Sequence, residues 1–307
     1  MRAFIFPGQG SQAVGMGAAL AEASGAAREV LGEVDEALGQ NLSRLMRDGP
    51  IEELTLTENA QPAIMANAIA VLRASGIDLP AKGAFVAGHS LGEYSALCGA
   101  GAFGLATAAR LLKLRGQAMQ AAVPVGVGAM AAMLGAGLSE AQRLVDETGE
   151  GDVLDVANDN DPSQVVISGH AAAVERAVAA AKEFGFKRGI LLPVSAPFHC
   201  RLMQPAADAM AEALGEAALA APAVPVYANV AAAPASDPDE IRDLLVRQVT
   251  GMVRWRESVA NMAEAGVTHF VELGGKVLGP MVKRIVPDAN VTSVVTPDDI
   301  DALLGAL

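Results

Sequence analysis

The sequence predicts an α/β protein: a large domain with a parallel sheet and a small domain inserted into it. Short apolar runs alternate with amphipathic helical stretches along the chain, which is typical of strands that alternate with helices. Between residues 128 and 195 the pattern becomes strand, helix, strand, strand, helix, strand, which is the ferredoxin-like order. We therefore place the large domain at residues 1–126 and 197–307 and the inserted domain at residues 127–196.

Four apolar runs predict strands of the large domain: 2–6, 83–88, 224–230 and 269–273. The first ends at Pro7 and a glycine-rich loop, and the second leads directly into a helix from about Leu91. A later helix has a clear start, because Asp237 suits the N-cap, Pro238 the first helical position, and Glu240 follows three residues after the cap.

The inserted domain is predicted from six elements in succession. They are a strand at 129–134, a helix at 139–148, strands at 153–158 and 164–168, a helix at 170–185 and a strand at 188–195. The cleft between two such domains is a common place for a small-molecule site, so we expect the functional residues there.

Composition argues against several classes of protein. Hydrophobic residues make up 52% of the 307 residues, and 35 acidic against 22 basic side chains give a net charge of −13. This charge argues against a nucleic-acid binder and against binding to an anionic membrane. Two cysteines, Cys98 and Cys200, predict neither a disulfide framework nor a metal-ligand cluster. Neither a signal peptide nor a membrane span is expected, so we predict a cytoplasmic protein.

The stretch GHSLG (88–92) places Ser90 in the G-x-S-x-G pattern of a serine nucleophile. Such a pattern also arises by chance in a chain rich in glycine and alanine. Here an apolar strand precedes it and a helix follows it, which is the context that the motif requires. The N–H group of Leu91, at the head of that helix, can stabilise an oxyanion.

A base for Ser90 has to come from one of four histidines. His89 is excluded because adjacent residues of an extended chain point to opposite sides, and we interpret it as a structural residue beneath the turn. Two others suit surface, capping or strand positions: His170 and His269. His199 lies on a loop at the edge of the inserted domain, where catalytic groups are common. Asp208 or a backbone carbonyl could orient its imidazole.

Arg115 lies on the apolar stripe of the helix predicted at 105–119, unlike the neighbouring cations Arg110 and Lys113. A buried guanidinium keeps its charge and needs an anionic partner. It could snorkel or form a structural ion pair. It could also hold a substrate carboxylate with two hydrogen bonds near Ser90.

The loop FPGQGSQAVG (6–15) formally satisfies the dinucleotide fingerprint G-x-G-x-x-G/A. No clear acidic residue ends a second strand near residue 30, as that fingerprint needs. Loops at the carboxyl ends of neighbouring parallel strands converge. The N–H groups of Gln9 and Leu91 could then face the same oxygen.

In combination these motifs resemble the malonyl-CoA:acyl carrier protein transacylase family of fatty acid synthesis. The resemblance covers nearly the whole chain. The stretches that carry it are FPGQGSQ (6–12), ENAQPAI (58–64), GHSLGEYSAL (88–97), RG (115–116), GAMAAMLG (128–135), QVVISG (164–169), PVSAPFHC (193–200), VRQ (246–248) and GGKVLGPMVKRI (274–285). One departure is GGKVL (274–278), where the family commonly has Gly-Pro-Gly before Lys-Val-Leu.

The resemblance implies a hydrolase-like core with the ferredoxin-like insert, and it implies roles for particular residues. These roles are Ser90 as nucleophile, His199 as general base, the carbonyl of Gln248 as the group that orients His199, the N–H groups of Gln9 and Leu91 as oxyanion hole, Arg115 as ligand of the malonyl carboxylate, and Gln61 as part of the acyl pocket. Phe198 stands where some relatives carry serine, and it resembles malonyl-selective synthase domains.

The predicted activity is ping-pong transfer of a malonyl group from malonyl-CoA to the phosphopantetheine thiol of acyl carrier protein. No metal or redox cofactor is expected, and the protein is expected to be a monomer. Five basic residues are candidates for docking the acidic carrier: Lys187, Arg188, Lys276, Lys283 and Arg284. The alternatives are a serine thioesterase or hydrolase, an acyltransferase of other selectivity in polyketide synthesis, a nucleotide-dependent oxidoreductase, and a non-catalytic synthase component.

Overall fold

Two separate β-sheets organise the fold. The structure is a computed structural model that describes residues 1–306. Within these residues the larger sheet has the order β10-β9-β1-β2-β7-β8 and the smaller one the order β4-β5-β3-β6. Their strands are β1 (Arg2–Phe6), β2 (Phe85–Gly88), β3 (Gly128–Leu134), β4 (Leu154–Asp161), β5 (Gln164–His170), β6 (Arg188–Leu191), β7 (Val226–Ala228), β8 (Ala233–Ala235), β9 (His269–Leu273) and β10 (Asn290–Val294).

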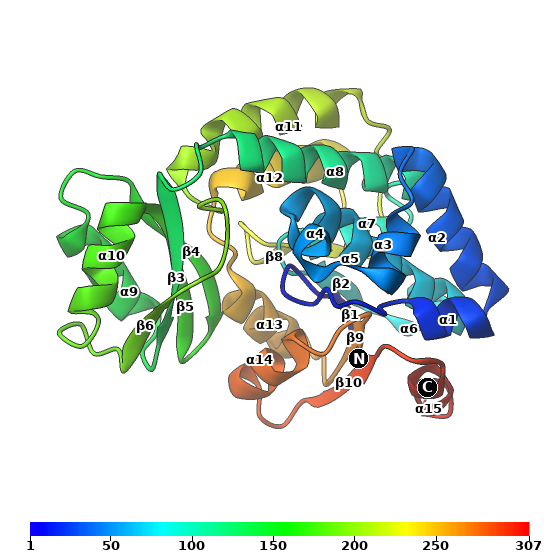
Figure 1. Cartoon of the computed structure of the whole chain (residues 1–307). Coiled ribbons are helices and arrows are strands. Elements are labelled where there is room, and N and C mark those ends of the chain that lie inside the picture. The colour runs from blue at the N-terminus through cyan, green and yellow to red at the C-terminus, as the bar shows by residue number, and fades with distance from the viewer. Residues whose placement is uncertain (307) are drawn as a thin grey trace.

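Helices cover both sheets, as Figure 1 shows, and the smaller sheet stands to one side with helices of its own. The helices are α1 (Ala18–Ala23), α2 (Gly25–Leu38), α3 (Leu42–Asp48), α4 (Ile51–Thr55), α5 (Thr57–Ser75), α6 (Leu79–Lys82), α7 (Gly92–Gly99), α8 (Leu105–Ala121), α9 (Leu138–Thr148), α10 (Ala171–Ala180), α11 (Gln204–Glu216), α12 (Pro238–Thr250), α13 (Trp255–Glu264), α14 (Leu278–Ile285) and α15 (Pro297–Leu304). In the part of the chain that the structure covers, no helix is both long and apolar enough to span a bilayer.

The central strand β1 is apolar on both sides because helices cover both faces of the larger sheet. Phe4 and Phe6 belong to the core on the side of α5 and α7, whereas Ala3 and Ile5 pack with Trp255 on the side of α13 and α14. A parallel strand that is buried on both faces has a continuous apolar sequence rather than an alternating one. This explains why the run at 2–6 was recognisable from the sequence.

The predicted α/β architecture is confirmed, with differences at the ends of some elements. β1, β2, β7, β9 and β10 pair in parallel. The strand predicted at 224–230 is shorter, since β7 covers Val226–Ala228. The side chain of Asp237 accepts hydrogen bonds from the N–H groups of Asp239 and Glu240, as expected for an N-cap. β8 and β10 were not predicted. Both lie at sheet edges; β8 has only three residues, one of them Pro234, and β10 has a mixed rather than an apolar sequence.

The ferredoxin-like order of the inserted segment is also confirmed, because β3 pairs antiparallel with both β5 and β6, and β4 with β5. The ends differ from the predictions: β4 continues to Asp161, β6 stops at Leu191, and α10 stops at Ala180. The boundaries 127 and 196 of the inserted domain stay a prediction.

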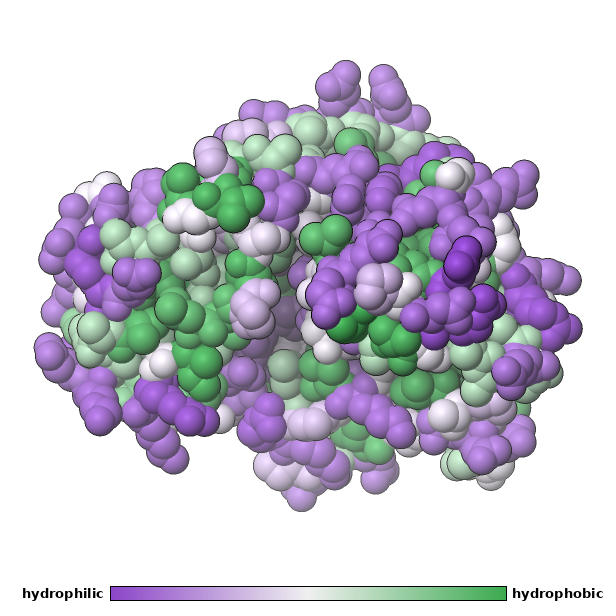
Figure 2. Space-filling view, in the orientation of Figure 1, coloured by the Kyte–Doolittle hydropathy of each residue, from purple (hydrophilic) through white to green (hydrophobic). Residues whose placement is uncertain are grey.

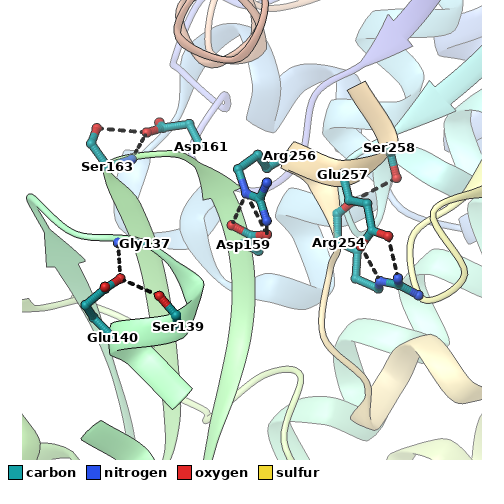
Figure 3. A network of polar contacts seen from close by, with 10 residues as sticks. All are labelled: Gly137, Ser139, Glu140, Asp159, Asp161, Ser163, Arg254, Arg256, Glu257 and Ser258. Atoms are coloured by element: carbon teal, nitrogen blue, oxygen red, sulfur yellow. Dashed lines mark hydrogen bonds and ion pairs between the residues drawn. The ribbon is translucent and has the colours of Figure 1, made fainter. Parts of the chain in front are cut away.

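Strand β4 joins the small sheet to the core through buried polar side chains, which accounts for its polar sequence NDND (158–161). Asp159, whose side chain is 1% exposed, accepts two hydrogen bonds from Nε of Arg256 on α13 (Figure 3). Asp161 accepts one from Nε of Arg284 on α14 at 2.8 Å. Since a buried carboxylate without a partner is costly, these pairs fix the small sheet against the core.

Candidate active site

Ser90 lies at a sharp turn between β2 and α7, in a conformation that non-glycine residues seldom adopt. Its φ angle is +54°, in the left-handed region. The chain on either side approaches itself so closely that a Cβ on Gly88 would lie 1.8 Å from the carbonyl oxygen of Gly92. The flanking glycines of the G-x-S-x-G pattern are therefore required by this turn. It presents Ser90 at the carboxyl end of the sheet.

His199 contacts Ser90, although the two residues are 109 positions apart in the sequence. Its Nε2 lies 2.7 Å from Oγ of Ser90, and its Nδ1 lies 2.8 Å from the main-chain oxygen of Gln248. A carbonyl oxygen can only accept, so Nδ1 carries the proton and Nε2 is free to accept one from the serine. Asp208 does not take this part: it is exposed on α11 and accepts a hydrogen bond from Gln204.

The imidazole of His199 is held in its neutral form. Burial lowers its pKa from 6.5 to about 3, and the positive charge of Arg115 acts in the same direction. The hydrogen bond to the carbonyl of Gln248 opposes this shift without cancelling it. A neutral imidazole is the form that can accept the serine proton.

His89 turns away from its neighbour Ser90, as the alternation of side chains requires. Its Nε2 lies 2.8 Å from Oδ1 of Asn160 on β4, and its ring lies 5.8 Å from that of Trp255. A Cβ on Gly8 would come within 2.6 Å of the main-chain oxygen of His89. The glycine loop thus packs directly on the serine turn, and His89 connects that turn to the small sheet.

The N–H groups of Gln9 and Leu91 are placed to face one oxygen. Phe6 pairs with Gly88 in the parallel register of β1 and β2, so the loops that follow the two strands emerge side by side. Gln9 and Leu91 line the same cavity as Ser90. Among residues 1–306, neither N–H donates a hydrogen bond to another protein group. These are the properties that an oxyanion hole needs.

Arg115 is buried beside the nucleophile. Its Nη1 donates to Oε1 of Gln61 at 2.8 Å, and its Nη2 donates to Oγ of Ser90 at 3.1 Å and to Oε1 of Gln248 at 2.8 Å. All three acceptors are neutral oxygens. No carboxylate within the described chain forms a salt bridge with Arg115, so the structural ion pair considered above is not formed. The face of Tyr94 lies 5.7 Å from the guanidinium carbon.

A cavity of about 300 Å³ brings these residues together. Figure 2 shows a hollow between the small sheet and the core, with apolar side chains on the side of the small sheet. Its lining includes the predicted residues Gln9, Gln61, Ser90, Leu91, Arg115, Phe198 and His199. Methionine and aliphatic side chains that were not predicted complete it: Met119, Met130, Leu192, Pro193 and Val194. Gln248 lies behind the cavity, fully buried.

Two buried polar residues behind the serine turn were missed. The side chain of Asn229 accepts the N–H of Ser90 at 2.7 Å and donates to the oxygen of Gly88 at 2.7 Å. Glu93 accepts hydrogen bonds from the N–H of Asn229 at 2.9 Å and from Nε2 of Gln248 at 2.8 Å. The available signal was a polar residue inside an apolar run, at Asn229 after VPVYA and at Glu93 in the helix GEYSALCG.

Comparison with known proteins agrees with this geometry. The family described as acyl transferase domain matches residues 3–278. A malonyl CoA-acyl carrier protein transacylase of Escherichia coli strain K12 is 46% identical over 303 residues, 98% of each chain. The crystal structure of acyl-carrier-protein-S-malonyltransferase from Bartonella henselae has a TM-score of 0.97 at 51% identity, covering 99% of this chain and 98% of that one.

A second solved structure shows a malonyl-transacylase in complex with its type II PKS acyl-carrier protein. It has a TM-score of 0.96 at 40% identity, covering 100% of this chain and 99% of that one. Family match, sequence identity and structural likeness each extend over most of the chain. The chain therefore belongs to the acyl transferase domain family and, within it, to the malonyl CoA-acyl carrier protein transacylases.

Proposed function

We propose that this protein transfers a malonyl group from malonyl-CoA to the phosphopantetheine thiol of acyl carrier protein through a malonyl ester of Ser90. The observation that carries the proposal is the guanidinium of Arg115, buried 3.1 Å from the nucleophilic oxygen. A buried cation whose direct partners are neutral oxygens has an unmet preference for an anion. The free carboxylate of a malonyl group supplies that anion at the right end of the acyl chain.

The first half-reaction follows from the Ser90–His199 contact. Nε2 of His199 takes the proton of Oγ while Oγ attacks the thioester carbonyl, and the N–H groups of Gln9 and Leu91 stabilise the oxyanion. Collapse of the tetrahedral intermediate breaks the C–S bond, and the proton on His199 goes to the departing thiolate of CoA. The carrier's thiol then attacks the malonyl-serine ester by the same steps in reverse.

Gln61 and Phe198 shape the acyl end of the cavity in this proposal. Gln61 is held between Arg115 and the hydroxyl of Thr57, to which its Nε2 donates at 2.9 Å. A group that is oriented before the substrate arrives costs less to order on binding. The buried ring of Phe198 forms part of the cavity wall and limits the size of the acyl group.

Acyl carrier protein is the proposed partner, which the complex of a related malonyl-transacylase with its carrier supports. Of the five basic candidates for docking, Arg284 is already engaged by the buried Asp161, and Nζ of Lys276 lies 3.9 Å from Asp299. Lys187 and Arg284 line the same surface depression. A Lys187→Glu variant should raise the KM for the carrier; an unchanged KM would remove this residue from the docking surface.

The absence of a metal or redox cofactor, the monomeric state and the cytoplasmic location are parts of this proposal that stay predictions. The first is supported by the chemistry, because acyl transfer through Ser90 and His199 balances without one. The oxidoreductase alternative is disfavoured because the glycine loop packs on His89. Titration with NAD(P) should give no binding.

Intact-mass analysis after incubation with a mixture of acyl-CoAs tests the function. A single malonyl adduct on Ser90 that disappears on addition of carrier protein is the expected result. Release of CoA at the same rate without carrier protein indicates a hydrolase. An adduct with another acyl group in preference to malonyl indicates a transferase of different selectivity, as in polyketide synthesis.

A further inference from the structure

Glu93 is a buried carboxylate directly behind the catalytic turn, and the mechanism above does not use it. It lies in the first turn of α7, three residues after Ser90, and is 1% exposed. Its Oε2 accepts hydrogen bonds from Nε2 of Gln248 and from the N–H of Asn229. Glu93 touches neither the cavity nor the reacting atoms, so any influence on the reaction passes through these neighbours.

The side-chain amide of Gln248 stands between Glu93 and Arg115. Its Nε2 donates to Glu93 at 2.8 Å and to the oxygen of Ser90 at 3.0 Å, while its Oε1 accepts from Nη2 of Arg115 at 2.8 Å. An amide has one donating end and one accepting end. An ionised carboxylate can only accept, so above the pKa of Glu93, which burial raises to about 7, Glu93 determines that the donating end faces it and that the oxygen faces Arg115.

Reversal of this amide would place an NH₂ group against the guanidinium. Two donors would then face each other without an acceptor, and Nη2 would lose one of its two hydrogen bonds. Arg115 would be free to rotate away from the acyl end of the cavity. The orientation of Gln248 thus decides where the positive charge of Arg115 points.

The charges in this network support a functional reason for Glu93. Burial raises its pKa to about 7, although the hydrogen bonds from Asn229 and Gln248 and the positive charge of Arg115 oppose the shift. A carboxyl group whose pKa is raised on folding destabilises the folded state at pH values above its unfolded pKa. A residue kept only for stability would not carry this penalty.

We propose that Glu93 is a positioning residue for acyl selectivity: through the Gln248 amide it holds the guanidinium of Arg115 toward the acyl cavity. The proposal rests on the proposed function, because it assigns Arg115 to the malonyl carboxylate. It makes Glu93 a determinant of malonyl binding that contacts no part of the substrate.

The test measures kcat and KM of the full-length protein with malonyl-CoA and acetyl-CoA for Glu93→Ala, Glu93→Gln and Arg115→Ala. Glu93→Ala should lower kcat/KM for malonyl-CoA by roughly 10- to 100-fold, mainly through KM, and leave acetyl transfer almost unchanged. Glu93→Gln retains an acceptor oxygen and should recover most of this loss. In the Arg115→Ala background, Glu93→Ala should have no further effect on malonyl transfer, because both act through one group.

A purely structural role gives a different pattern. Equal losses for both acyl groups, or an additive loss in the Arg115→Ala background, would overturn the proposal. Melting temperatures at pH 8 separate folding from positioning, since Glu93→Gln should melt at or above the wild-type temperature. Glu272 is a matched control, being a fully buried carboxylate that accepts the N–H groups of Leu278 and Gly279. Glu272→Gln should change stability without changing the malonyl-to-acetyl ratio.

A failure of the Glu93 proposal can be distinguished from a failure of the proposed function. If the wild-type protein forms no malonyl adduct, the proposed function itself fails. If the wild-type protein forms the adduct and Arg115→Ala loses malonyl selectivity, the function stands, and the Glu93 variants alone decide the proposal.

Discussion

Replacement of Arg115 by alanine tests whether this residue makes the acyl transferase selective for the malonyl group. The guanidinium donates hydrogen bonds of 2.8, 3.1 and 2.8 Å, and the side chain is 1% exposed. A malonyl carboxylate bound there forms a desolvated charge pair, and truncation of one member of such a pair costs about 2–5 kcal/mol. At about 1.4 kcal/mol for each factor of ten, kcat/KM for malonyl-CoA should fall by roughly 30- to 5000-fold.

The assay compares release of CoA from malonyl-CoA and from acetyl-CoA in the presence of carrier protein. Acetyl has no carboxylate, so Arg115→Ala should affect its transfer far less. Arg115→Lys is the control, because it keeps the charge but loses the planar fork that reaches Gln61 and Gln248 together; it should recover part of the malonyl activity. Similar losses with both substrates would refute the reasoning, since Arg115 would then act on Ser90 rather than on the acyl group.

The further predictions concern the nucleophile, the base and the contact between the sheets. Ser90→Ala should abolish labelling by radioactive malonyl-CoA, whereas replacement of the buried Ser95 on the adjoining helix α7 should leave it intact. Because the pKa of His199 is lowered to about 3, kcat/KM should show no His199 ionisation between pH 5 and 7. The same shift makes the unfolding free energy fall as pH drops from 6.5 towards 3, where the unfolded chain binds the additional proton; His199→Ala should flatten this dependence in urea unfolding at several pH values. Arg256→Ala leaves Asp159 buried without its cation. This variant should lower the unfolding free energy by about 3–5 kcal/mol. A loss below about 1 kcal/mol would show that the pair is screened by solvent.

Much of the fold was predictable because it depends on local, repeating features of the sequence. The runs at 2–6 and 269–273 have apolar residues at adjacent positions, as strands buried on both faces do, and β1 and β9 have these bounds. The edge strand β10, with the sequence NVTSV, has no such signature and was missed. β4 was predicted too short because its last residues are polar. They continue the pairing with β5, and Arg256 and Arg284 from the core bind their buried carboxylates.

The residues of the candidate site likewise divide into those with a local sequence signal and those without one. Ser90 could be recognised from its own neighbours, since the flanking glycines are needed locally for the turn. The exclusion of His89 also followed from local geometry, and the structure turns its ring toward Asn160. Glu93 could not be assigned, because its partners Asn229 and Gln248 lie 136 and 155 residues further along the chain. A contact over that distance is fixed by tertiary packing, of which a single sequence carries no local trace.

The nucleophile and the base are both held in strained backbone conformations, and the residues that hold them do not touch the substrate cavity. Ser90 and His199 have φ angles of +54° and +57°, and a non-glycine residue in such a region costs roughly 1–3 kcal/mol. Asn229 fixes the N–H of Ser90, and the carbonyl of Gln248 fixes the ring of His199. Asn229 follows β7 and Gln248 lies on α12. The segment from β7 to α12 therefore connects the turn that carries Ser90 with the loop that carries His199. Glu93 binds the main-chain N–H of Asn229 and the side-chain amide of Gln248. The groups that hold the two reacting residues are different, namely Oδ1 of Asn229 and the carbonyl of Gln248. Loss of Glu93 should therefore change the direction of Arg115 while Ser90 and His199 keep their contacts, so that acetyl transfer survives when malonyl binding is weakened.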